Sequence, residues 1–113
     1  MKKLQIIAEP AALDSVVDIL NENAVRRFTV TELKEYGVGT QAAVFRGQAY
    51  HIKFKARVTV EAILPAETIQ VVVAALRKGV SPARQLEVYV SPVERVELAA
   101  QVKSPILAEV GVN

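Results

Sequence analysis

The most regular hydrophobic pattern in the chain is a strict alternation over residues 50–64. Its apolar positions are Ile52, Phe54, Ala56, Val58, Val60 and Ala62, and its polar positions are His51, Lys53, Lys55, Arg57, Thr59 and Glu61. A period of two residues predicts a β-strand with one apolar face. About fifteen residues exceed the usual strand length, and the core of a small domain is too short to cover that face. We therefore expect part of this strand to pack against another subunit.

Residues 28–33 alternate in the same way and are rich in β-branched residues, which predicts a second strand that ends before Gly37. No period continues from Gly37 to Gly47. Loops of about a dozen residues inside a small domain are usually either functional or disordered. We interpret this one as a functional loop.

Two further segments show the spacing of an amphipathic helix. Apolar residues recur at i, i+3, i+4 and i+7 after Pro10 and again after Pro65; they are Leu13, Val16, Val17 and Leu20, then Ile69, Val72, Val73 and Leu76. Each set forms one apolar stripe, and proline is well tolerated in the first turn of a helix. Polar residues at 21–23 and Gly79 indicate where these helices end.

Shorter strands are predicted at residues 4–8, 86–90 and 93–98. The order strand, helix, strand, strand, helix, strand is the ferredoxin-like βαββαβ plan of the α+β class, with helices on one face of a sheet. A long hairpin loop then joins the second and third strands. We assign residues 1–98 to this domain and residues 99–113 to a C-terminal tail, which is either disordered or lies across a neighbouring subunit.

Composition removes several classes of protein. The 113 residues, 51% of them hydrophobic, are enough for one domain. No window approaches about 18 apolar residues, so no transmembrane helix is expected, and the N-terminus does not read as a signal peptide, which favours a cytoplasmic protein. The chain has no cysteine and one histidine, too few for a dedicated transition-metal site. A net charge of +2 with 5% aromatic residues argues against nucleic-acid binding.

Groups for catalysis are also scarce. His51 has no cysteine or serine at a spacing that suggests a nucleophile and base, so we interpret it as a surface histidine and expect no catalytic residues. Lys53, Lys55 and Arg57 project from one strand face about 6.6 Å apart. They form either a solvated face or an anion-binding ridge at the base of the loop, where Arg57 offers bidentate hydrogen bonds to a carboxylate or phosphate.

Three short motifs follow one another in the chain. They are Val30-Thr31-Glu32, Arg46-Gly47 with Tyr50, and Ser91-Pro92-Val93-Glu94, accompanied by the Met1-Lys2-Lys3 start and by Pro10. In this order and nearly this spacing they resemble the PII family of trimeric signalling proteins. The resemblance covers residues 1 to about 97.

The resemblance implies a homotrimer with ligand clefts between subunits, where family members hold ATP or ADP and, with magnesium, 2-oxoglutarate. Thr29 and Gly37 match positions that line the nucleotide pocket, and Arg57, with Lys55 beside it, stands where the family keeps a basic residue near its ligand. The implied function is a regulator without catalytic activity that binds a small anionic effector. It controls a membrane transporter or an enzyme in nitrogen regulation or inorganic carbon uptake.

The resemblance also implies that the loop at roughly residues 35–49, the T-loop of the family, docks onto the partner. The expected contact residues are Val38, Thr40, Gln41, Phe45, Arg46 and Tyr50. Tyr50 matches a tyrosine that some family members have modified by uridylylation, and whether it is modified here stays open.

Several departures from the family pattern predict weak binding of nucleotide phosphates. Residues 78–87 replace a glycine-rich phosphate loop but contain one glycine and Pro82, which has no N–H to donate. Residues 98–100 replace two arginines, Glu35 replaces a glycine, and Glu9 replaces a lysine near the 2-oxoglutarate site. The effector therefore stays open between an adenine nucleotide and a small anion such as bicarbonate.

Two other classes share this plan of strands and helices. One is a metal-binding trimer of the CutA type, which the single histidine and the lack of cysteine disfavour. The other is a small ferredoxin-like enzyme, in which His51 would be the residue to test.

Overall fold

The computed structural model describes residues 1–45 and 48–99, and it describes side chains for residues 1–37 and 54–99. The elements in chain order are β1 (Lys2–Ala8), the 3-10 turn η1 (Pro10–Ala12), α1 (Leu13–Glu22), β2 (Thr29–Phe45), β3 (Gln48–Leu64), α2 (Ala66–Gly79), the 3-10 turn η2 (Pro82–Arg84) and β4 (Glu87–Pro92). This order confirms the predicted βαββαβ plan.

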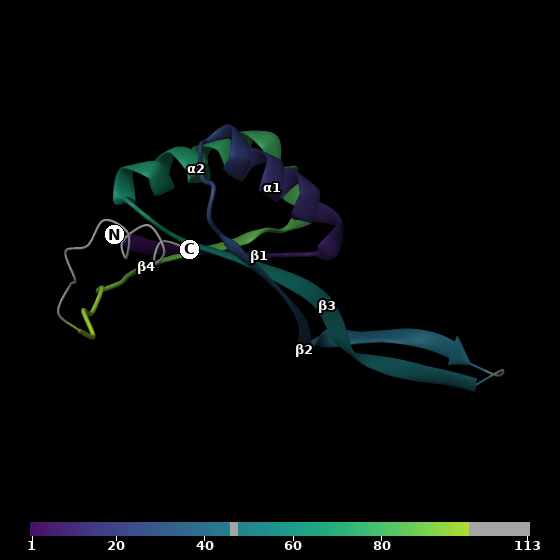
Figure 1. Ribbon diagram of the computed structural model, residues 1–113. Helices are drawn as coiled ribbons and strands as arrows, with labels where there is room; N and C mark the ends of the chain where they lie inside the picture. The colour runs from purple at the N-terminus through teal and green to yellow at the C-terminus, as the bar shows by residue number, and fades with distance from the viewer. Residues whose placement is uncertain (46–47, 100–113) are drawn as a thin grey trace.

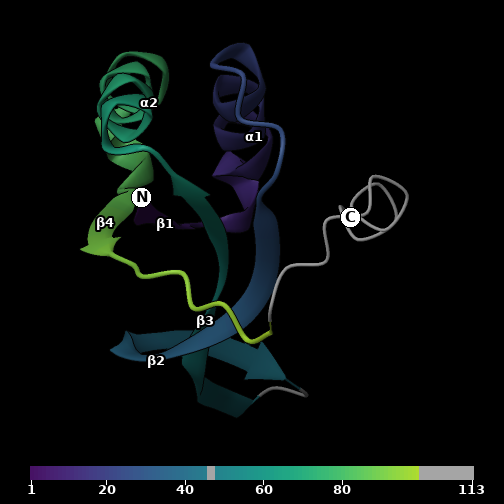
Figure 2. The same cartoon turned by 60° about the vertical axis from the view of Figure 1, so that its left-hand side comes forward.

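One four-stranded antiparallel sheet, in the order β2-β3-β1-β4, carries both helices on the same face (Figures 1 and 2). β1 is central because it pairs with β3 on one side and β4 on the other; Leu4, for example, lies opposite both Ala62 and Val90. We call the helix-covered side the helix face and the other side the open face.

The hydrophobic core lies between the helices and the helix face of the sheet. Its most buried large side chains are Leu4 and Ile6 from β1, Val60 from β3, Val16 and Leu20 from α1, and Val72 from α2. These are the residues that the strand and helix periods place on the inner faces. Neither helix among the described residues is long and apolar enough to cross a lipid bilayer.

β2 and β3 form a hairpin that projects beyond the helices (Figure 1). Each strand has 17 residues. The radius of gyration is 18.9 Å, whereas a compact chain of this length would have about 13 Å. The hairpin therefore extends well past the domain that anchors it.

The structure corrects the predicted loop over residues 35–49. β2 continues to Phe45 and β3 begins at Gln48, with Gln41 opposite Ile52 and Phe45 opposite Gln48. Backbone pairing satisfies the N–H and C=O groups whatever the side chains are, so a strand can form where the sequence shows no hydrophobic period.

A bulge divides the hairpin into a proximal and a distal part. Tyr36 lies opposite Phe54, but the next pair is Gln41 with Ile52, so residues 37–40 of β2 face the single residue 53 of β3. Gly37 has a φ of +86°, a left-handed conformation that favours glycine. Such bulges bend the strand and increase its local twist.

The apolar face of β3 is only partly covered, as its length predicted. Val58, Val60 and Ala62 are buried beneath the helices, whereas Phe54 is 37% exposed and Ala56 is exposed. The helices end before this part of the strand (Figure 1).

The predicted strand at residues 93–98 is absent, because these described residues have no regular secondary structure. A strand requires a neighbour for its backbone hydrogen bonds, and this segment follows directly from the edge strand β4. Val96 is 67% exposed and Leu98 is 94% exposed. The described residues of one chain thus give these apolar side chains little to pack against.

Two adjacent valines of α2 provide a matched test of the core. Val72 is fully buried and Val71 is 56% exposed. Val72→Ala should lower the free energy of unfolding by about 2–3 kcal/mol, from two methyl groups at about 0.8 kcal/mol each plus the cavity. Val71→Ala should be neutral or slightly stabilising, since alanine is the better helix former. Urea denaturation at one protein concentration measures both, and equal effects would contradict the assigned helix phase.

Candidate functional site

Arg57 is a buried arginine on the open face of β3, where the hairpin leaves the sheet. It is 6% exposed. Its Nη2 donates a hydrogen bond of 3.0 Å to Oε2 of Glu87 on β4, and its Nε lies 3.6 Å from Oε1 of Glu35 on β2. A guanidinium taken out of water needs such carboxylates to offset its desolvation. Arg57 therefore joins three strands of the sheet.

The Nε edge of Arg57 is incompletely satisfied. Among the described residues it has no hydrogen-bond partner, although it is shielded from solvent. A separation of 3.6 Å from Glu35 is an ion pair rather than a hydrogen bond. Because a buried donor without an acceptor costs about 1–3 kcal/mol, this edge is a favourable place for an added oxygen acceptor.

Glu87 is held from its other side by Tyr89. The Tyr89 hydroxyl donates a hydrogen bond of 3.1 Å to Oε1 of Glu87. The hydrogen bond and negative charge of Glu87 raise the pKa of the Tyr89 phenol. Glu87 is thus fixed by two donors, one on each carboxylate oxygen.

A second ion pair closes the same end of the sheet. Nη1 of Arg84 in η2 donates a hydrogen bond of 2.9 Å to Oε1 of Glu9, which follows β1. Arg84 lowers the pKa of the Glu9 carboxyl below its ordinary value of 4.5, and the nearby charges of Lys55 and Arg57 lower it further.

Six charged side chains therefore gather here, and we call them the base cluster. They are Glu9, Glu35 and Glu87 with Lys55, Arg57 and Arg84. Their formal charges, three negative and three positive, cancel. A neutral cluster gives little general attraction to a highly charged anion.

The backbone of η2 offers few donors to an anion. The amide of Ala83 donates to the Ser81 hydroxyl, that of Arg84 to the Ser81 carbonyl, and that of Gln85 to the Pro82 carbonyl. Pro82 has no N–H. The turn is therefore satisfied internally, unlike a loop whose amides converge on a phosphate.

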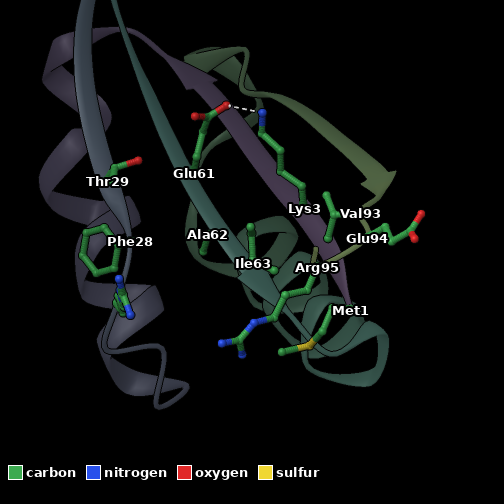
Figure 3. Close-up of a pocket in the computed structure, with 11 residues that line it drawn as sticks. Met1, Lys3, Phe28, Thr29, Glu61, Ala62, Ile63, Val93, Glu94 and Arg95 are labelled. Atoms are coloured by element: carbon green, nitrogen blue, oxygen red, sulfur yellow. Dashed lines mark ion pairs between the residues drawn. The ribbon is translucent and has the colours of Figure 1, made fainter. Parts of the chain in front are cut away.

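A groove of about 690 Å³ lies toward the other end of the sheet (Figure 3). Phe28 and Thr29 form one side and Arg95 contributes to the other. Nζ of Lys3 lies 3.0 Å from Oε2 of Glu61 within it. The groove thus presents apolar surface with a few polar groups, as small-molecule sites do.

A family model described as "Nitrogen regulatory protein P-II" matches residues 1–102. The chain belongs to the PII family. Proteins named "Nitrogen regulatory protein P-II" from Rhizobium meliloti (strain 1021) and Rhizobium leguminosarum bv. viciae are 34% and 33% identical over 99 residues, covering 85% of this chain and 88% of each relative. The protein of the same name from Cereibacter sphaeroides is 32% identical over 101 residues, covering 84% and 88%.

Membership of the PII family confirms the resemblance that the motifs indicated, and it makes the chain a PII-like signalling regulator. It does not favour the CutA-like trimer or the small enzyme, because the match spans nearly the whole domain. The PII family is regulatory, in agreement with the scarcity of catalytic groups in the sequence.

The structure brings some of the predicted ligand residues together and separates others. Lys55 and Arg57 belong to the base cluster, and Gly37 begins the bulge two residues after Glu35. Thr29 instead borders the groove. It pairs with Glu61, four register steps from Arg57, or about 13 Å along the strand.

Of the two interpretations of the basic face of β3, the solvated face is wrong for Arg57, which is buried and paired with carboxylates. Its role in anion binding stays a prediction. Period-two alternation places Arg57 on the polar face but does not show that neighbouring strands cover that face. The side chains of Lys53 and His51 lie outside the described part of the structure.

The predicted partner contacts also fall largely outside the description. The backbones of Val38, Thr40, Gln41, Phe45 and Tyr50 lie in β2 and β3, but their side chains are not described, and Arg46 lies outside the described residues. These assignments stay predictions.

Sequence reasoning missed the partner role of Glu87 and Tyr89. Glu87 reaches Arg57 across β1, so the contact depends on the register of three strands. Glu35 and Glu9 carried a signal, because each replaces a family residue of different charge. The structure pairs each of them with an arginine.

The pair between Glu9 and Arg84 gives a prediction for titration. Arg84→Gln should raise the pKa of Glu9 toward 4.5, because the hydrogen bond from Arg84 is the main cause of its depression. A depressed carboxyl pKa stabilises the fold above 4.5, and that contribution is lost as the pH falls through the folded value. Carbon NMR of the Glu9 carboxyl measures the shift, with Arg77→Gln on α2 as control. An unchanged pKa in the Arg84 variant would contradict the assignment.

Proposed function

We propose that this chain is a cytoplasmic, homotrimeric PII regulator that has no catalytic activity. It binds a small anionic effector at the base cluster, in clefts between subunits. It controls a partner, a membrane transporter or an enzyme, through the distal part of the β2–β3 hairpin. The observation that carries this proposal is the buried Arg57 guanidinium, whose Nε has no hydrogen-bond acceptor among the described residues.

The separation of the predicted ligand residues supports a cleft built from two subunits. Thr29 and the base cluster lie at different positions along the strands of one sheet. They are too far apart for one small ligand to contact both. A neighbouring chain can bring its Thr29 end against the base cluster of the first. The exposed Val96 and Leu98 and the uncovered part of β3 provide apolar surface for that contact.

The chemistry of the base cluster supports a small anion of low charge. Its charges cancel, so a polyphosphate would bring negative charge beside Glu9, Glu35 and Glu87 without enough cations to balance it. The η2 amides are already used within the turn. A planar oxyanion such as bicarbonate or a carboxylate fits one edge of a guanidinium.

The geometry of the hairpin supports its role in docking. It projects from the domain, as Figure 1 shows, and its base carries the cluster while its distal part lies beyond the bulge. An effector that binds at the base therefore acts on the element that reaches the partner. Val38, Thr40, Gln41, Phe45, Arg46 and Tyr50 remain our proposed contact residues on this part.

The test is binding of a small anion to the intact protein. Calorimetric titration with sodium bicarbonate should detect binding that Arg57→Lys weakens at least tenfold, because lysine lacks the planar fork of donors. Tenfold corresponds to about 1.4 kcal/mol. Arg77→Lys makes the same change at an exposed position of α2 outside the base cluster and should bind as the wild type does.

Two results would contradict the proposal. One is equal bicarbonate affinity in the Arg57 and Arg77 variants, which would place binding elsewhere. The other is a monomer mass of 12.3 kDa by light scattering at micromolar concentration, because a cleft between subunits requires the trimer.

ATP should bind at least a hundredfold more weakly than to nucleotide-sensing PII relatives. The charge-assisted hydrogen bonds that a phosphate cradle supplies are worth about 1.5–3 kcal/mol each, and a hundredfold is about 2.8 kcal/mol, so two missing contacts suffice. Calorimetry with ATP and ADP, with and without magnesium and bicarbonate, measures the affinity beside such a relative. A low-micromolar dissociation constant would show that other side chains bind the phosphates.

A further inference from the structure

The carboxylate of Glu35 stands at the edge of Arg57 that an effector anion would use. Glu35 is on β2, directly opposite Lys55, and its side chain is 27% exposed. Its Oε1 is 3.6 Å from Nε of Arg57. The isolated chain therefore already places one of its own oxyanions beside the incompletely satisfied donor.

The two carboxylates around Arg57 differ in how firmly they are held. Glu87 accepts a hydrogen bond of 3.0 Å from Nη2 of Arg57 and another of 3.1 Å from Tyr89. Glu35 approaches the guanidinium without a hydrogen bond, and the structure gives it no second donor from Tyr89 or Arg84. Glu35 is thus the partner that a better-placed acceptor can replace.

We propose that Glu35 competes with the effector for the Nε edge of Arg57. This competition limits the effector to anions of low charge. This inference rests on the proposed function and adds the regulation of the same site. A planar monoanion, a carboxylate or hydrogencarbonate, replaces Glu35 at the Nε edge and leaves the charge facing Arg57 unchanged. A polyanion would add negative charge beside the fixed Glu87, so the pair of carboxylates selects against it.

The position of Glu35 links this exchange to the hairpin. It lies immediately before Tyr36 and two residues before Gly37, where the bulge begins. Replacing it at Arg57 releases the ionic contact between β2 and the rest of the sheet two residues before the bulge, while the backbone pairs with β3 remain. When the effector is bound, the distal hairpin is therefore held without the ionic contact between Glu35 and Arg57.

Contacts on the helix face keep β2 and β3 paired when Glu35 leaves Arg57. The rings of Tyr36 and Phe54 are 5.8 Å apart, and Nζ of Lys34 lies 4.8 Å from the centre of the Phe54 ring. Aromatic and cation–ring contacts of this kind stabilise cross-strand pairs. The exchange therefore removes the ionic contact between Glu35 and Arg57 while β2 and β3 keep their register.

The experiment compares Glu35→Gln with Glu32→Gln in the full-length trimer. Both changes remove one negative charge from β2, but Glu32 is exposed on the helix face, opposite Val58. Sodium formate and sodium hydrogencarbonate are titrated separately at constant ionic strength, adjusted with sodium chloride. The readout is the proton–nitrogen NMR signal of Arg57 Nε, assigned by its loss in Arg57→Lys.

Glu35→Gln should bind at least one of these anions about tenfold more tightly than the wild type, and Glu32→Gln should match the wild type. Glu35→Ala, which leaves no side-chain acceptor at this position, should also bind more tightly and should shift the Arg57 signal before any anion is added. The alanine variant keeps the test decisive if the glutamine amide takes the place of the carboxylate or the glutamine variant folds poorly.

The outcomes separate the two proposals. Equal anion affinity in the wild type and both Glu35 variants, with a clear response of the Arg57 signal, would overturn the competitor role and leave the effector site standing. An Arg57 signal that responds to neither anion in any of these proteins would overturn both. A response to formate alone or to hydrogencarbonate alone identifies which oxyanion replaces Glu35.

Discussion

The buried guanidinium of Arg57 is the constraint on which the end of the sheet at the base of the hairpin depends. A cation that is 6% exposed must keep carboxylates close, and its carboxylates come from the edge strands β2 and β4. Removing one partner of a buried pair leaves the other charge uncompensated. The positions of Glu35 and Glu87 are therefore tied to each other through one side chain, although their strands are not neighbours.

The hairpin depends on this constraint because it projects beyond the helices that cover the core (Figure 1). Beyond the helices, β2 and β3 are joined by backbone pairing and, on the helix face, by the contact between Tyr36 and Phe54. Two-stranded ribbons are marginal alone in water. Ionic contacts at the base of the hairpin thus have more influence on it than comparable surface pairs elsewhere, which typically contribute little.

The sequence was most informative where burial imposes a period. Alternation and helical spacing located the elements of the core, because Val60 and Val72 face the same apolar interior. No hydrophobic period continues through residues 37–45. Backbone pairing forms there without one, so it could not be predicted. Residues 93–98 carry apolar side chains, but the described part of the chain provides no partner strand for them.

For the candidate site, the sequence identified single residues but not their contacts. Arg57 and Lys55 were predicted from residue type and resemblance, and Glu35 was recognised as a departure from the family. The reach of Arg57 to Glu87 could not be predicted, because it requires the registers of β3, β1 and β4 together. Side-chain burial on the polar face follows from the same three registers.

The bulge at residues 37–40 has a consequence for how such a protein changes over evolutionary time. Four residues of β2 face one of β3, so a mismatch in strand length is absorbed there rather than passed on to Arg57. Insertions, deletions or new side chains beyond the bulge leave the spacing of the ionic contacts intact. The part proposed to contact a target can therefore diversify while the proposed effector site is retained, and one effector site can come to serve a different target.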